Sequence, residues 1–195
     1  MHLYDRACRK FKQNKLLWKE YLEFLTRTKS LQKLNRTVAN ALLVHPDTLD
    51  FWLIGAYAEL DLKGNLFSSR NLMLQALRAN EDSSRFQLAY LEFEVKYLDK
   101  LMQRREILTG TKKLNEQGEL VESGELAFID EDDDSANVEG EVKKGEESNI
   151  VKIVAQSIIT KFGSDAKVLK EASKILKKSP RVSAETLRNV KGAYQ

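Results

Sequence analysis

Few side chains in this 195-residue chain are of the kinds that carry out catalysis or bind metals. The two histidines, His2 and His45, have no nucleophile at a useful spacing, and His45 precedes Pro46 where a helix is expected to end. The single cysteine, Cys8, lies on an apolar helix face and is expected in the core. A zinc site needs several Cys or His ligands, and no glycine loop suited to phosphate is present. We therefore expect no enzyme activity, no cofactor and no metal.

Charged side chains form two further candidates. The run Asp130–Asp134 lacks the spaced oxygens and turn glycine of a calcium loop, so a solvated charge run is favoured. A basic cluster could contact RNA or a partner, although an ordinary polar outer face beside an acidic segment explains it equally well. The cluster consists of Lys100, Arg104, Arg105, Lys112 and Lys113.

The net charge of +3 conceals a division into three parts. Residues 1–108 carry a net +5, residues 109–148 a net −9 and residues 149–195 a net +7. A basic folded body suggests an acidic partner such as RNA. One cysteine excludes an internal disulfide, and no stretch approaches the roughly 20 apolar residues of a membrane span.

Aromatic residues at a repeated spacing indicate the fold. Trp18, Tyr21 and Phe24 are three residues apart, which places them on one face of a helix. Similar sets return 34 and then 35 residues later, and this period is typical of stacked helix pairs. Such a stripe could stack RNA bases, but its leucine neighbours favour packing between helices. The later sets contain Trp52 and Glu59, and then Tyr90, Phe93 and Glu94.

The elements that would position these residues are helices throughout. Small residues recur on the second helix of each pair, at Ala41 and Ala76, and indicate close helix crossings. The fold class is all-α: a right-handed superhelical array of antiparallel helix pairs. The sequence begins on the second helix of a pair, so we expect a fragment of a longer protein. We expect helices at residues 2–12, 15–27, 31–44, 48–62, 66–79, 84–97, 99–108, 149–163, 165–178 and 183–194.

The domain organisation that follows has three parts. Residues 1–108 form the repeat array, residues 109–148 an acidic disordered linker, and residues 149–195 basic helices.

The pattern resembles the half-a-TPR (HAT) repeat. Trp18, Tyr21 and Phe24 match its first helix, and Ala41 and Pro46 match its second. The next repeats keep Trp52 and Glu59, and Tyr90, Phe93 and Glu94. They depart from the pattern where Gly55 and Ala58 replace aromatics, Gln87 replaces Trp and Glu81 replaces Pro.

The segment from Tyr4 to Arg105, followed by an acidic insertion and basic helices, is similar to the HAT-repeat subunit family of the UtpB subcomplex of the small-subunit processome. The resemblance implies a non-catalytic nucleolar scaffold in pre-rRNA processing and small ribosomal subunit biogenesis. It implies WD-repeat protein partners, with a small nucleolar RNA or pre-rRNA nearby, and neither a membrane nor a small-molecule substrate. The alternatives are a direct RNA-binding module, or a HAT scaffold of the spliceosome or of mRNA 3′-end processing.

Overall fold

The computed structural model describes residues 2–108, 146–179, 182 and 184–193, and within these ranges it is entirely helical. Side chains are described for residues 3–104, 149–179, 182 and 184–193. The expectation of an all-α fold is confirmed. The helices are α1 (His2–Lys10), α2 (Lys15–Arg27), α3 (Leu31–Val44), α4 (Leu49–Tyr57), the π-helical turn η1 (Ala58–Leu62), α5 (Leu66–Ala79), α6 (Ser84–Leu108), α7 (Glu146–Phe162), α8 (Ala166–Lys177) and α9 (Ala184–Gly192).

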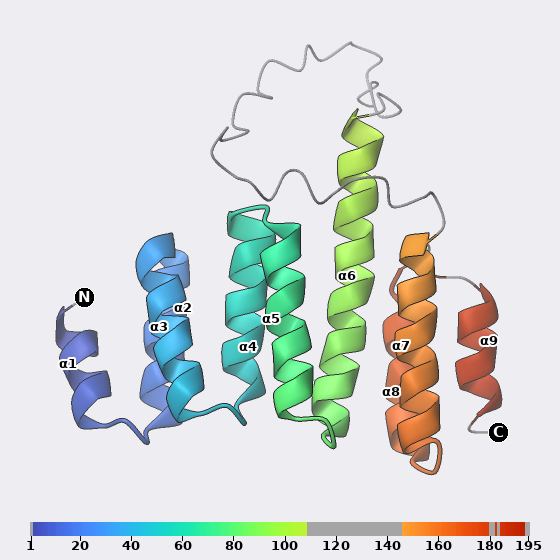
Figure 1. The fold of residues 1–195 in the computed structure, drawn as a ribbon, viewed down its shortest axis with the longest axis horizontal. Coiled ribbons are helices and arrows are strands. Elements are labelled where there is room, and N and C mark those ends of the chain that lie inside the picture. The colour runs from blue at the N-terminus through green and yellow to red at the C-terminus, as the bar shows by residue number, and fades with distance from the viewer. Residues whose placement is uncertain (1, 109–145, 180–181, 183, 194–195) are drawn as a thin grey trace.

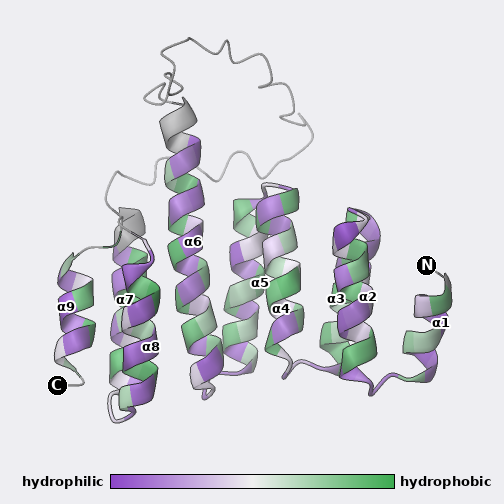
Figure 2. Cartoon of the chain, turned by 180° about the vertical axis from the view of Figure 1, so that it is seen from behind, coloured by the Kyte–Doolittle hydropathy of each residue, from purple (hydrophilic) through white to green (hydrophobic). Residues whose placement is uncertain are grey.

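The helices form a row from α1 to α9 in which α2 overlaps α3 and α7 overlaps α8 in this view, and consecutive helices run in opposite directions (Figure 1). Hydrophobic and hydrophilic residues alternate along most of them, as expected when a helix buries one side (Figure 2). The C-terminal turns of α6 project beyond the neighbouring helices. None of the helices that the structure describes is long and apolar enough to cross a bilayer.

Turn chemistry sets most of the helix bounds. Asn14 and Asn65 cap α2 and α5 by accepting hydrogen bonds from the backbone N–H groups of residues three positions on. Gly64 adopts a left-handed φ of 68°, as the sequence predicts for a residue that ends a helix. The bounds of α2, α3 and α5 match the expected ranges to the residue.

Two expected boundaries are wrong by more than two residues. Residues 84–97 and 99–108 form one continuous helix, α6, rather than two. Neither Pro nor Gly interrupts this stretch, and the fully buried Leu98 lies where the break was expected. Helix α7 begins at Glu146 instead of Asn149. The predicted linker, except for its last residues, 146–148, lies outside the described residues.

The π-helical turn explains why the repeat spacing changes from 34 to 35 residues. From the N-cap of α2 to that of α3, Asn14 to Ser30, the chain takes 16 steps, whereas from Thr48 to Asn65 it takes 17. The extra residue falls in the segment that contains η1, and a π-helical turn accommodates one more residue than an α-turn. The backbone N–H of Asn65 donates to the Glu59 carbonyl at 3.0 Å, which closes this wide turn.

Helices α7 to α9 share a core with the middle of the row. Helix α6 packs against α5, α7 and α8, and one cluster of buried residues runs from Ala56 to Val190. At its edge Ser179 donates to Asp99 at 2.7 Å, and Lys178 pairs with Glu92 at 2.7 Å. Helices α7 and α8 therefore stack directly on α6, and α9 packs on α7 and α8.

A hydrogen bond recurs at the first residue of each repeated aromatic set, which we call a ladder. Trp18 and Trp52 donate from Nε1 to the carbonyl six residues earlier, each at 2.9 Å. Gln87, which stands where the repeat pattern has Trp, donates from Nε2 to the Glu81 carbonyl at 3.4 Å. The glutamine thus keeps the N–H donor of the indole while losing its ring, and the turn before each helix is fixed in the same way.

Candidate protein-binding groove

One glycine interrupts the aromatic ladder at the centre of the row. Tyr21 on α2 and Tyr90 on α6 occupy equivalent places in the first and third repeats, and both are buried. The equivalent residue on α4 is Gly55, which lies three residues after Trp52 as Tyr21 lies three after Trp18. A Cβ on Gly55 would approach Val38 Cγ1 to 2.9 Å, and Leu72 lies beyond it. The side chain that fills this position in the other repeats is therefore missing here.

A groove lies along this position, between α3 and α5, with α4 as its floor. It has a volume of about 550 Å³. The floor is the stripe Trp52, Gly55 and Glu59, and the α3 side carries Leu43, whose side chain is 82% exposed. Its lining is mainly apolar and includes Val38, Ala39, Leu42, Pro46, Leu72 and Ala79. The volume is within the ~300–1,000 Å³ typical of binding pockets. We call this hollow the α3–α5 groove.

One end of the groove is closed by a polar cluster. Asn35 donates from Nδ2 to Glu59 Oε1 at 2.8 Å, and Lys63 pairs with the same oxygen at 2.7 Å. Glu59 is only 6% exposed, so these two partners provide the compensation that a buried carboxylate requires. The Glu59 carboxylate on the floor of the groove is therefore already paired. The open part of the groove is lined mainly by apolar side chains.

The two helices that border the groove carry only positive charge. Helices α1, α3 and α5 together contain seven basic residues and one acidic residue, Asp5. Helices α2 and α4 with η1 contain three basic and five acidic residues. Arg36 and Arg78, on α3 and α5, are exposed, and no described residue forms an ion pair with either of them.

A second hollow lies between α2 and α4. It is lined by Leu53, Ile54, Tyr57 and Leu62, together with the charged residues Glu23, Arg27 and Asp61. Asp61 pairs with Lys100 on α6 at 3.1 Å. Helix α4 thus contributes to two hollows through different residues, which explains why it carries a single charged residue, Asp50.

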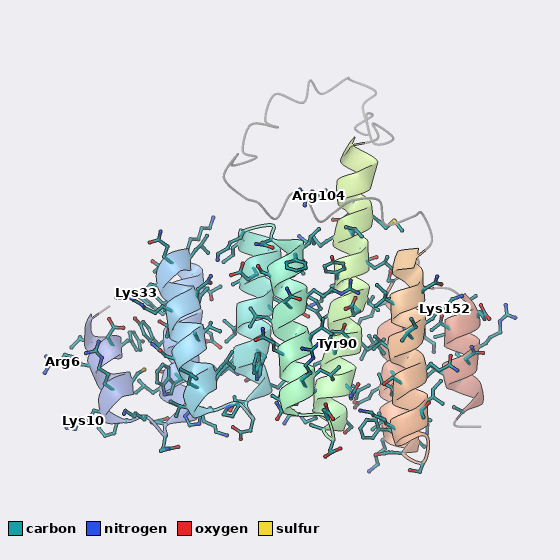
Figure 3. The ribbon with its side chains drawn as sticks, in the orientation of Figure 1. Arg6, Lys10, Lys33, Tyr90, Arg104 and Lys152 are labelled. Carbon is teal, nitrogen blue, oxygen red and sulfur yellow. The ribbon has the colours of Figure 1, made fainter. Side chains whose placement is uncertain are left out.

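The structure buries most of the residues that the sequence singles out in the ladder. Figure 3 shows Tyr90 on α6, in the middle of the row. Phe24 is half-buried and stacks on Tyr4, whereas Pro46 is exposed and contributes its carbonyl to Trp52. The buried members are Trp18, Tyr21, Ala41, Trp52, Glu59, Ala76, Tyr90, Phe93 and Glu94.

The basic residues predicted to contact RNA or a partner do not form one described patch. Lys100 is half-exposed and paired with Asp61, while Arg104 is exposed on the upper part of α6 (Figure 3). The side chains of Arg105, Lys112 and Lys113 lie outside the described residues.

Cys8 and His45, which were considered for catalysis or metal binding, are both buried in packing positions. Cys8 is buried, and burial raises the pKa of its thiol to about 11. His45 is 4% exposed, packs on Phe51 and places Nε2 2.8 Å from the Lys12 carbonyl, so Nε2 is the donor. Among the described residues, no group of His, Cys, Asp and Glu side chains could hold a metal ion.

Sequence reasoning did not find the groove. Gly55 stands where two other repeats have Tyr, but a Cβ there would lie 2.9 Å from Val38 Cγ1. Val38 therefore takes the space of the missing tyrosine, and the hollow lies beside it.

The chain is similar in sequence to curated proteins of one kind. The chain is 31% identical over 110 residues to U3 small nucleolar RNA-associated protein 6 of Schizosaccharomyces pombe, which covers 56% of this chain. It is 25% identical over 130 residues, or 65% of the chain, to the human homologue of that protein, and 24% identical over 104 residues to the mouse homologue.

The chain resembles U3 small nucleolar RNA-associated protein 6.

The chain spans only a part of these relatives, 22% of the length of the yeast and human proteins and 17% of the mouse protein. No protein-family model matches the sequence. The names of the relatives state an association with U3 small nucleolar RNA, and this association is a property of those proteins.

Proposed function

We propose that this chain is part of a non-catalytic scaffold subunit of a nucleolar ribonucleoprotein that processes pre-rRNA for the small ribosomal subunit. It would belong to the HAT-repeat subunits of the UtpB subcomplex, with WD-repeat proteins as partners and U3 small nucleolar RNA or pre-rRNA nearby. The observation that carries the proposal is the similarity to three U3 small nucleolar RNA-associated proteins.

The packing supports a repeat array of the HAT kind. The hydrogen bonds from Trp18, Trp52 and Gln87 recur with the 34- and 35-residue spacing. A further pair of contacts joins neighbouring repeats at equivalent carbonyls, since Lys12 O contacts His45 and Pro46 O accepts from Asn80. We infer that residues 1–108 form a right-handed superhelical array, which would hold binding surfaces in fixed relative positions.

A scaffold role also fits the chemistry of the described residues. The buried ionisable groups Glu59 and Glu94 are each held by cations or amides in packing positions. Catalysis needs an acid, base or nucleophile within reach of an open pocket. In the α3–α5 groove the acidic group is Glu59, which already binds Asn35 and Lys63.

The proposal is tested by purifying the tagged protein from cells and measuring the RNA that accompanies it. U3 small nucleolar RNA should be enriched well above a small nucleolar RNA of the same structural class that acts on the large subunit. Mass spectrometry of the same sample should find WD-repeat proteins. Equal recovery of the two RNAs would contradict the assignment.

Direct RNA binding is the second candidate function. It is favoured by the basic residues at the N-terminal end of the row, where Arg6 and Lys10 project from α1 (Figure 3). Neutralising several phosphates would make the affinity fall steeply with salt. The affinity of the purified chain for a 20-nucleotide RNA, measured between about 50 and 200 mM salt, distinguishes this function from a scaffold without RNA contact.

A further inference from the structure

We propose that helix α8, near the C-terminal end of the row (Figure 1), binds the phosphate backbone of single-stranded RNA. The contacts are made by four lysines on its exposed face, Lys167, Lys170, Lys174 and Lys177, which we call the α8 lysine stripe. This inference goes beyond the scaffold function and rests on it only in taking RNA to be near the chain.

The spacing of the four lysines places them in one line along α8. They follow one another at intervals of three, four and three residues, and all four are exposed. At about 100° and about 1.5 Å per residue, they lie within a sector of about 80° and span about 15 Å of the helix axis. Even the stacked strand of a duplex has one phosphate per about 3.4 Å of axis, so about 15 Å spans four phosphates.

The charge of the stripe is not compensated within the described part of the chain. Seven other described lysines pair with an Asp or a Glu, whereas no described residue forms an ion pair with any lysine of the stripe. The acidic residues from 149 to 195 are Asp165, Glu171 and Glu185. Asp165 caps α8, Glu185 pairs with Lys152, and Glu171 is exposed on α8 itself. The stripe is therefore available to an external anion.

The composition of the exposed face favours RNA over an acidic protein segment. The large apolar side chains of α8, Val168, Leu169, Ile175 and Leu176, are all buried, so none is left as an interface anchor. Protein interfaces depend on such anchors and are depleted in lysine. A nucleic acid needs no apolar anchor, because its affinity comes largely from the counterions released when lysines neutralise its phosphates.

Four phosphate contacts predict a definite dependence of RNA affinity on salt. For a single strand, the logarithm of the affinity falls against the logarithm of the salt concentration with a slope of about −0.7 per neutralised phosphate. Four contacts give a slope of about −2.8, which lowers the affinity about 50-fold between about 50 and 200 mM salt.

The test measures binding of a fluorescent 20-nucleotide oligouridine to the whole 195-residue chain by fluorescence anisotropy, between about 50 and 200 mM salt. The variant Lys167→Gln/Lys170→Gln/Lys174→Gln/Lys177→Gln removes the charge and keeps a good helix former at each position. We expect its affinity at about 50 mM salt to be at least about tenfold lower and its salt slope to be less steep by about 2.8. A mixed-sequence RNA of the same length should give the same result, because phosphate contacts carry no sequence information.

A matched control removes the same charge from scattered positions. It is the variant Arg27→Gln/Arg36→Gln/Arg78→Gln/Arg85→Gln. These arginines are exposed, lie on α2, α3, α5 and α6, and form no ion pair with a described residue. Charges more than about 10 Å from the RNA are largely screened, so the control should lower the affinity less than about threefold. Circular dichroism should show that both variants stay folded, since every altered side chain is exposed.

The proposal is overturned if the whole chain does not bind oligouridine at about 50 mM salt, if the lysine variant keeps the wild-type affinity and salt slope, or if the control variant loses as much affinity. It is also overturned if polyglutamate of the same length displaces the RNA at equal concentration, because the stripe would then prefer an acidic polypeptide. In each of these cases U3 small nucleolar RNA can still accompany the tagged protein through its partner proteins. Failure of the stripe and failure of the proposed function are therefore distinguishable.

Discussion

Arg70 on α5 holds the carboxylate of Glu94 on α6 through two hydrogen bonds, Nε to Oε1 at 2.9 Å and Nη2 to Oε2 at 2.8 Å. Glu94 is 2% exposed, so the pair lies within the packed row. The contact joins the second helix of one repeat to the first helix of the next. Asn35 and Glu59, also 24 residues apart, make the equivalent contact between α3 and α4.

Removing the guanidinium should be costly because it leaves a buried carboxylate without its cation. We expect Arg70→Met to lower the free energy of unfolding by about 3–5 kcal/mol, as for other broken buried ion pairs. Urea denaturation measures the change. The control is Lys15→Met in the exposed pair between Lys15 and Asp47, which should cost less than about 1 kcal/mol. Equal costs for the two variants would show that the Arg70 pair is not buried.

Trp52 is expected to be a structural residue rather than a contact for RNA bases. Trp52→Ala should cost about 3–5 kcal/mol because it truncates a buried aromatic side chain. Trp52→Phe keeps most of the packing and loses the hydrogen bond to Pro46 O, so it should cost less. Thermal denaturation compares them with Leu43→Ala, whose exposed side chain should matter little. An unchanged melting temperature for Trp52→Ala would refute its burial.

Lys29 adopts a left-handed backbone that favours glycine. Its φ is 52°, and Gly64, at the equivalent turn 35 residues later, has a φ of 68°. The left-handed conformation costs an L-residue about 1–2 kcal/mol, and glycine loses about 0.5–1 kcal/mol through its freer unfolded state. Lys29→Gly should therefore stabilise the protein by about 0.5–1 kcal/mol, measured by urea denaturation.

The reverse substitution is the control for this prediction. Nothing lies within 4 Å of a Cβ placed on Gly64, so Gly64→Ala would destabilise through its backbone conformation and not through a clash. If Lys29→Gly destabilises the protein as well, the left-handed assignment at Lys29 is incorrect.

Asp5 should make stability depend on pH in the acidic range. The Tyr21 hydroxyl donates to Asp5 at 2.5 Å, and this bond, supported by Lys33 at 3.0 Å, holds the pKa of Asp5 below its ordinary value of 3.8. A carboxyl whose pKa is lower in the folded state stabilises the protein above 3.8, and this contribution disappears as the pH falls through the folded pKa.

Tyr21→Phe removes the principal cause of that lowered pKa. The loss of stability relative to the wild type should be largest near neutral pH and should shrink as the pH falls below 3.8. Denaturation at a series of pH values measures this difference. Tyr57→Phe, which loses a hydrogen bond from Lys96, is the comparison and should show a difference that does not follow the titration of Asp5. A pH-independent cost for Tyr21→Phe would contradict the role of Asp5.

The sequence predicts the helices well because their ends have local causes. Asn14, Asn65 and Gly64 act through the backbone of their own turns, so α2 and α5 can be located without knowledge of the rest of the fold. The continuity of α6 was missed although neither Pro nor Gly interrupts the stretch around Leu98. Leu98 is buried in the core cluster that α6 shares with α7 and α8, which are distant in the sequence.

The groove depends on relations between repeats and is harder to predict. The replacement of Tyr by Gly at position 55 is visible in the sequence, but only the structure shows that Val38 takes the space, with Cγ1 2.9 Å from where a Cβ would lie. The one-sided charge of α3 and α5 becomes apparent only when their residues are grouped by helix. Similarly, Gln87 departs from the Trp of the repeat pattern. Only the structure shows that its amide donates the hydrogen bond that the tryptophans donate in the other repeats.

The most direct test of the proposed function is the rRNA made by cells after the full-length protein is depleted. Northern blots with probes for the pre-rRNA and for both mature subunit RNAs measure the outcome. The account predicts accumulation of uncleaved precursor and loss of small-subunit rRNA, with large-subunit rRNA maintained, and rescue by the re-expressed protein. Normal small-subunit rRNA after depletion, or equal loss of both rRNAs, would contradict it.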